Sequence, residues 1–175
     1  MLEEEDSVAK TWIVIFSLVL GMMILAGCGS QNNSPRAINE ETDKCMTCNM
    51  MVANVPGSTQ LLLKSGKTMV FDDLGCMIKW VEANEDVEVE KSYVRDFYTM
   101  DWIEQDKATY AYDPTFATPM AYGMVSFKIK SDAETYITEQ GKGVLMTAAE
   151  MQTKLVQLTS GGMNSHDDHM HEGGI

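Results

Sequence analysis

The chain has 175 residues, with 26 acidic against 13 basic ones, and a formal net charge of −13 at pH 7. Such an acidic chain repels nucleic acid and anionic membrane surfaces, so neither is an expected partner. Without an N-terminal leader and a polar tail, the remaining length fits one ordinary domain or two very small ones.

The first patterned segment is an apolar run at residues 11–25, TWIVIFSLVLGMMIL. It has the length of a signal-peptide hydrophobic region and is shorter than the roughly 20 apolar residues that a membrane span needs. The run ends in LAGC, the pattern of a lipobox, which predicts removal of residues 1–27 and attachment of a lipid such as palmitate to Cys28. Residues 28–42 are then a flexible tether, and the rest lies on the extracytoplasmic face of a bacterial membrane. The alternative is a plain N-terminal anchor helix.

A Cys-x-x-Cys pair, Cys45 and Cys48, follows in the stretch DKCMTCNMMV, which also contains three methionines: Met46, Met50 and Met51. Two sulfurs at this spacing can chelate one ion or close a disulfide. Thiolate and thioether together select a soft metal, above all Cu(I). Three alternatives stay open: a thioredoxin-like redox motif, although no strand precedes the pair; a zinc site with Cys76 as a third ligand; and a structural disulfide.

The first half of the mature chain predicts the order strand, strand, helix, strand. A β-hairpin is expected around the glycine turn at residues 65–67. Asp73 is the expected N-cap of a helix that ends near Asn84, and a strand is expected at residues 87–98. The apolar face of the helix has the spacing i, i+3, i+4 and i+7: Leu74, Met77, Ile78 and Val81.

Cys76 lies in the first turn of this expected helix, where the helix dipole lowers the pKa of a thiol. That position allows a reactive thiol or a metal ligand. It equally allows a small buried side chain on the same face as Trp80 and Ala83, and we expect burial.

The second half repeats this order more weakly. Strands are expected at residues 110–114, 124–129 and 143–146. A helix is expected from Ser131 or Asp132, as its cap, to a stop at Gly141, and a last helix from a Thr147–Glu150 capping box to about Leu158. One offset of 56 residues relates two matched triplets, which suggests duplication: Phe71, Met77 and Trp80, and Phe127, Ala133 and Tyr136.

Two further segments carry candidate ligands. Met120 follows Pro119 on a loop of small residues and is a candidate thioether ligand; the alternative is a loop residue that covers the core. In the flexible tail, residues 161–175, imidazoles and carboxylates suit a borderline divalent ion such as Cu(II), Ni(II) or Zn(II). The alternative is a solvated tail without a ligand. The histidines of this candidate secondary site are His166, His169 and His171.

Five segments, in this order, resemble the NosL family of copper-chaperone lipoproteins: LAGC, DKCMTCNMMV, MVFDDLGCM, VRDFYTMDWI and TPMAYGMVSF. The resemblance spans about residues 43–151. It implies an α+β fold of two small ββαβ-type domains, residues 43–100 and 101–160, related in shape to the organomercurial lyase fold.

The resemblance also implies a function that is not enzymatic. It implies one Cu(I) ion held by Cys45, Cys48, Met50 and Met120, and delivery of this copper to nitrous oxide reductase, an enzyme of denitrification, during assembly of its copper-sulfide centre. Other copper-trafficking or Nos membrane proteins are further expected partners. Ala121 stands where the family usually has the glycine of a Pro-Met-Gly turn.

Two other functions stay open from the sequence: an extracytoplasmic thiol-disulfide oxidoreductase, and a copper-sequestering resistance lipoprotein that binds metal mainly through its tail. A chaperone must hold Cu(I) and also release it. Few, exposed, soft ligands with an open coordination position are therefore expected.

Overall fold

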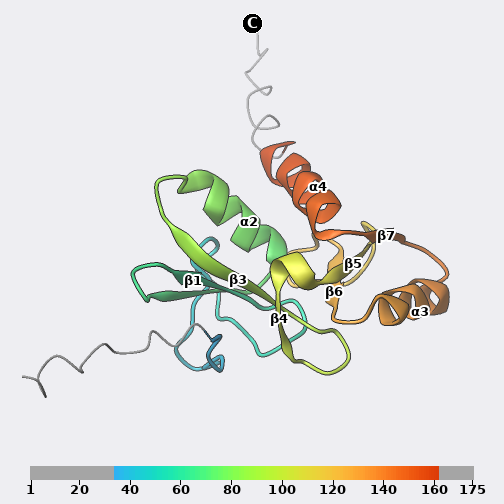
Figure 1. Ribbon diagram of the computed structural model, residues 1–175, viewed down its shortest axis with the longest axis horizontal. Coiled ribbons are helices and arrows are strands. Elements are labelled where there is room, and N and C mark those ends of the chain that lie inside the picture. The colour runs from blue at the N-terminus through green and yellow to red at the C-terminus, as the bar shows by residue number, and fades with distance from the viewer. Residues whose placement is uncertain (1–33, 162–175) are drawn as a thin grey trace, which may run out of the picture. The chain divides into compact units, whose positions relative to one another are not determined.

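The computed structural model describes residues 34–161 (Figure 1). The predictions for the signal peptide, for Cys28 and for the three tail histidines lie outside this range. Within it, the fold is α+β as predicted, with two antiparallel sheets and three α-helices. Among the helices of this range, none is both long and apolar enough to cross a membrane.

The first sheet has the strand order β2-β1-β3-β4, and all neighbours are antiparallel. Its strands are β1 (Thr59–Leu63), β2 (Thr68–Phe71), β3 (Val89–Arg95) and β4 (Trp102–Glu104). The predicted hairpin is confirmed, and Gly66 in its turn has a φ of +85°, which glycine adopts without a steric penalty. The sequence did not predict β4, a short strand that pairs along the outer edge of β3.

Helix α2 (Leu74–Ala83) connects β2 to β3. Asp73 is its N-cap, as predicted: the Oδ1 atom accepts a hydrogen bond from the Gly75 N–H at 2.9 Å. The helix ends at the predicted Asn84. Leu74, Met77 and Ile78 of the predicted apolar face are buried, and Val81 is half-buried.

The second sheet has the order β6-β5-β7, again antiparallel, and a 3₁₀ turn, η2 (Gln105–Lys107), leads into it. Its strands are β5 (Thr109–Tyr112), β6 (Met124–Phe127) and β7 (Val144–Met146).

Helix α3 (Lys130–Gln140) lies between β6 and β7. The predicted caps Ser131 and Asp132 are wrong: Ile129 is the N-cap and makes no side-chain capping bond. The reason is that the backbone itself starts the helix, since the Ile129 carbonyl accepts from the Asp132 N–H at 3.1 Å. The predicted stop is confirmed, because Gly141 is the C-cap with a φ of +65°.

Helix α4 (Ala148–Gly161) starts with the predicted capping box. The Thr147 N–H donates to Glu150 Oε2 at 2.8 Å, and the Glu150 N–H donates to Thr147 Oγ1 at 3.3 Å. The helix extends beyond the predicted end at Leu158. Its last turns are held by tertiary contacts with α2: Thr159 is buried and its hydroxyl donates to Glu82 Oε2 at 2.9 Å.

The two halves share one topology, as the expected duplication requires. In each, the first strand lies between the second and the third, and a helix links the second strand to the third; the first sheet has β4 in addition. Phe71 and Phe127 end the equivalent strands, and both are fully buried. Their rings contact the matched helix residues, with centroids 6.2 Å apart for Phe71–Trp80 and 5.4 Å for Phe127–Tyr136. The division into domains at residues 100/101 stays a prediction, as does the relation to organomercurial lyase.

Candidate metal site

The Cys-x-x-Cys pair lies on a short loop that is closed like a hairpin. An isolated antiparallel bridge joins Lys44 to Met51. Inside it, the Cys45 N–H donates to the Met50 carbonyl at 2.8 Å, and the Asn49 N–H donates to the Cys45 carbonyl at 2.9 Å. Asn49 has a φ of +62°, a left-handed conformation that asparagine tolerates better than most residues. The backbone therefore fixes the loop that carries both sulfurs.

Asp43 anchors the base of this loop. Arg36 donates to its two carboxylate oxygens at 2.6 and 2.7 Å, and the Asn39 N–H donates to it at 2.8 Å. The bond from the Arg36 guanidinium holds the pKa of Asp43 below its usual value. Arg36 is itself tied to the first sheet, because the buried Gln60 side chain of β1 bonds its backbone N–H and carbonyl at 3.0 and 2.7 Å.

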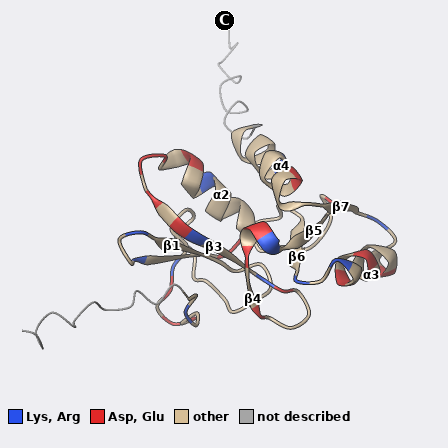
Figure 2. Cartoon of the chain, in the orientation of Figure 1, with Lys and Arg blue, Asp and Glu red and all other residues tan. Residues whose placement is uncertain are grey.

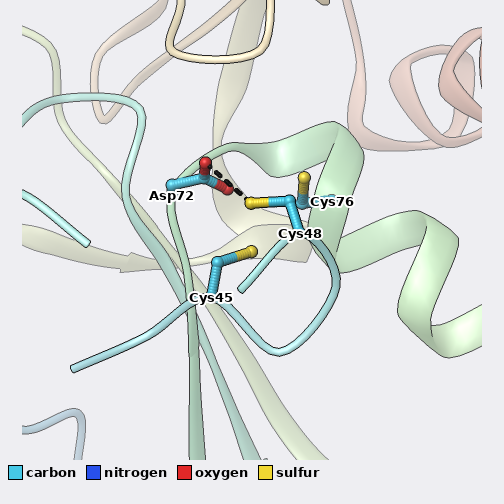
Figure 3. A group of neighbouring side chains, drawn as sticks. All are labelled: Cys45, Cys48, Asp72 and Cys76. Carbon is cyan, nitrogen blue, oxygen red and sulfur yellow. Dashed lines mark hydrogen bonds between the residues drawn. The ribbon is translucent and has the colours of Figure 1, made fainter. Parts of the chain in front are cut away.

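Four potential metal ligands lie close together where the loop meets the start of α2 (Figure 3). They are the sulfurs of Cys45, Cys48 and Cys76 and a carboxylate oxygen of Asp72, and these atoms all lie within 4.8 Å of one another. Cys45, Asp72 and Cys76 are 2%, 4% and 2% exposed, and Cys48 is half-buried. We call these four residues the Cys/Asp cluster.

The cluster forms because the loop is fastened to the junction between β2 and α2. The Met46 N–H donates to the Val70 carbonyl of β2 at 3.2 Å. The Thr47 hydroxyl donates to the Cys76 carbonyl in the first turn of α2 at 2.7 Å. Asp72 lies between these two elements, and its Oδ2 atom accepts a hydrogen bond from the Cys48 thiol at 3.2 Å. Its Oδ1 atom is buried and has no hydrogen-bond partner.

The three thiols differ in acidity. A hydrogen bond from the Cys76 thiol lowers the pKa of Cys45 to about 6. The same bond, together with burial, raises the pKa of Cys76. Burial raises the pKa of Cys48 to about 11. At neutral pH the cluster thus holds one thiolate and two thiols, and an entering metal ion has to displace protons to gain further thiolates.

A loop of the second half covers the start of α2. The Met120 N–H donates to Asp73 Oδ2 at 3.0 Å, so the helix cap also holds this loop. The Tyr122 ring lies against Gly75, where a Cβ atom would come within 2.2 Å of the ring. Ala121 has a φ of +58°, so alanine adopts the left-handed conformation for which glycine is usual at this turn.

The predicted ligands differ in where the structure places them. Cys45 and Cys48 lie together, as their spacing indicated. Met120 is half-buried and packs against the hydrophobic core that includes Cys45 and Cys76. Met50 lies on the loop itself and is 47% exposed.

Two expectations about the cysteines can be compared with the structure. The burial expected for Cys76 is confirmed, and its sulfur is nevertheless within reach of the other donors. The expectation of exposed ligands is wrong for Cys45, because the loop folds back onto β2 and α2. All three cysteines in the described range are free thiols, so no structural disulfide joins Cys45 to Cys48 here.

Asp72 was missed by sequence reasoning. Its signal was the first of the two adjacent acidic residues in VFDDLGC, directly before the N-cap Asp73. The helix cap needs only Asp73, so no local structural role accounts for Asp72. Nothing local in the sequence indicates that Cys48, 24 residues earlier, is its neighbour.

Comparisons with known proteins agree with this architecture. The family model described as NosL matches residues 35–156. Among solved structures, the chain is similar to the crystal structure of the copper chaperone NosL from Shewanella denitrificans, with a TM-score of 0.56 and 24% sequence identity over 65% of this chain and 92% of that chain. At this identity the likeness concerns the fold. No curated protein matches the chain.

Proposed function

Because this chain belongs to the NosL family, we propose that it is a non-enzymatic Cu(I) chaperone, anchored by a lipid at the extracytoplasmic face of a bacterial membrane. It delivers copper to nitrous oxide reductase while the copper-sulfide centre of that enzyme is assembled. The observation that carries the proposal is the Cys/Asp cluster, in which three thiols lie within 4.8 Å of one another.

The donor set supports Cu(I) as the cargo. Thiolates are soft ligands, and two or three of them satisfy Cu(I) without any further donor. Cys45 and Cys76 are buried and hold the inner side of the ion, whereas Cys48 is half-buried and faces the route of exchange. Met50 and Met120 are the proposed thioether ligands. One Cu(I) ion is the expected load.

Release follows from the uneven exposure of the ligands. An acceptor can approach Cys48 first and replace it, while the buried sulfurs still hold the ion. Copper then passes through an intermediate that both proteins share, and it never enters solution as a free ion. The lipid on Cys28 keeps donor and acceptor at one membrane, which raises their effective concentration.

The surface charge supports an acceptor with a basic docking face. Figure 2 shows acidic residues along the end of α2 and into the start of β3. These residues follow closely in the sequence: Glu82, Glu85, Asp86, Glu88 and Glu90.

A deletion strain grown under copper limitation tests the function. Without the gene, nitrous oxide reductase should be made in normal amount but lack copper. The wild-type gene should restore the metal, whereas a Cys45→Ser/Cys48→Ser double variant should not. A Cys28→Ser variant, which keeps the metal ligands and loses the lipid, should restore it in part. Fully metallated reductase in the deletion strain would show that the protein has another function.

A further inference from the structure

Tyr122 lies on a turn whose backbone is fixed at several points. The residues on either side of it, Ala121 and Gly123, both have left-handed backbones, with φ values of +58° and +68°. The Thr118 carbonyl accepts from the Ala121 N–H at 3.0 Å, and the Thr118 hydroxyl accepts from the Gly123 N–H at 3.2 Å. The Gly123 carbonyl accepts from the Asp113 N–H at 3.1 Å. A strained backbone that its surroundings hold in place in this way is typical of a functional position.

The ring of Tyr122 contacts the first turn of α2 at Gly75. A Cβ atom at position 75 would come within 2.2, 2.4 and 2.5 Å of three ring carbons, so the ring can lie there only because the residue is glycine. The next residue along the helix is Cys76 of the cluster. Met120, two residues before Tyr122, is held by the N-cap Asp73. The ring therefore lies where the second half of the molecule meets the cluster.

The side chain of Tyr122 is half-buried and packs against the hydrophobic core that includes Cys45 and Cys76. Burial raises the pKa of its hydroxyl, and negative charge on Cys76 and on the two adjacent aspartates raises it further, so the hydroxyl lies near the cluster. Cys76 is 2% exposed with the ring in place. An aromatic ring excludes water from the surface that it covers, so Tyr122 shields this side of the cluster.

We propose that the Tyr122 ring is a fixed cover over the Cys76 side of the cluster, which slows the exchange of bound Cu(I) and directs exchange to Cys48. The inference rests on the proposed function, because it concerns the route by which the cargo leaves. Ligand exchange requires an incoming donor to reach the ion, and the half-buried Cys48 stays accessible for it. A cover slows entry and exit alike, so it changes both rates and leaves the affinity almost unchanged.

Transfer of Cu(I) from the loaded full-length chain to an excess of a chromophoric chelator measures the effect of the cover. Tyr122→Ala removes the ring, and should speed the transfer by at least about tenfold while the equilibrium affinity changes by less than about threefold. Tyr122→Phe keeps the ring and should stay within about twofold of the wild type. Tyr98→Ala is the control and should change neither value, since this tyrosine is 47% exposed and its ring packs on Phe127 in the second half.

Gly75→Ala displaces the ring without removing it. The new methyl group occupies the space of the ring, so this variant should show the fast transfer of Tyr122→Ala. The double variant Gly75→Ala/Tyr122→Ala should be no faster than either single variant, because both changes remove the same cover. Alanine is a better helix former than glycine, so the substitution does not by itself weaken α2.

Alkylation of the metal-free chain tests the cover without copper. The rate at which iodoacetamide modifies Cys76, followed by peptide mass spectrometry, should rise at least about fivefold in Tyr122→Ala and in Gly75→Ala. It should stay unchanged in Tyr122→Phe. Cys45 is the internal reference, because an equal rise at this buried thiol would indicate general loosening of the fold and overturn a local cover.

Failure of the cover and failure of the copper function can be told apart. Cu(I) transfer that Tyr122→Ala leaves unchanged, or that Tyr122→Phe speeds equally, overturns the inference and leaves the copper function intact. A loss of affinity as large as the gain in rate also overturns it, since Tyr122 would then contribute to binding. A wild-type chain that does not bind Cu(I) tightly overturns the proposed function, and the alkylation of Cys76 then decides whether the ring covers this thiol.

Discussion

The two halves of the molecule turn from strand to helix in the same way, but of the two junctions only the first carries residues of the Cys/Asp cluster. After Phe71 the chain continues with Asp72 and, within the first turn of α2, with Cys76. At the same offset of 56 residues, the second half has Lys128 and Asp132. The strand–strand–helix–strand unit is repeated, but the cysteines and the aspartate of the cluster are not. The candidate metal site therefore depends on these particular residues and not on the fold.

The helix caps differ in the same way. Asp73 bonds both Gly75 in its own helix and Met120 in the other half. Its counterpart Ile129 makes no side-chain bond and is 55% exposed. The loop of Met120 in the second half is therefore held in place by the helix cap of the first half.

The largest expected effect separates the cysteines of the cluster from Asp132, the residue of the second half that matches Cys76. Cys45→Ser and Cys48→Ser should each weaken Cu(I) binding by more than about a hundredfold, since loss of a ligand exceeds the effect of an outer contact. Asp132→Ser should leave the affinity unchanged. Competition with a Cu(I) chelator measures all three, and equal losses in Asp132→Ser and Cys48→Ser would abolish the distinction between the two halves.

The pH dependence of binding tests the protonation of the cluster. Cys45, with a pKa of about 6, is already a thiolate at neutral pH, whereas Cys48, with a pKa of about 11, has to lose its proton to bind. Affinity for Cu(I) should therefore rise with pH between roughly pH 7 and pH 9, about tenfold per unit for each displaced proton, and hence about a hundredfold per unit where both Cys48 and Cys76 bind as thiolates. Below about pH 6 the slope should steepen, because protons then compete for Cys45 as well. A flat profile would mean that the thiols are not ligands.

The N-caps of α2 and α3, Asp73 and Ile129, should differ by a smaller amount in their contribution to stability. Asp73→Ala removes the acceptor for Gly75 and Met120, and should lower the free energy of unfolding by about 1–2 kcal/mol. It should also weaken Cu(I) binding, because the Met120 loop loses its anchor. Ile129→Ala, at the matched position, should stay within about 0.5 kcal/mol of the wild type. Urea unfolding of the metal-free chains gives both values, and a cost at Ile129 as large as at Asp73 would contradict the contrast.

The smallest expected effect is at Ala121. Its φ of +58° disfavours alanine, and glycine relieves that strain at the expense of a more flexible unfolded chain. Ala121→Gly should therefore raise the free energy of unfolding by about 0.5 kcal/mol, with unchanged copper affinity. A clear loss of stability would mean that the left-handed turn is not populated.

Sequence reasoning succeeded where the signal is local. The Asp73 cap, the Gly141 stop and the Thr147–Glu150 capping box each depend on residues within one turn of a helix, and all three are confirmed. Phe71 and Phe127 indicated the repeat because each packs on an aromatic residue of its own unit.

It failed where distant segments decide the outcome. The last turns of α4 are held by the contact between Thr159 and Glu82, 77 residues apart. Strand β4 exists because β3 offers a free edge. Asp72 becomes part of the site because the Cys-x-x-Cys loop packs beside it, and no spacing in the sequence shows that.

X-ray absorption at the copper edge of the Cu(I)-loaded full-length chain tests most directly whether the cysteine cluster holds the cargo. The expected spectrum contains sulfur scatterers alone, and Cys48→Ser should lower their number or prevent loading. An imidazole pattern around copper, unchanged in Cys48→Ser, would place the metal on the histidines of the tail and contradict a cysteine site.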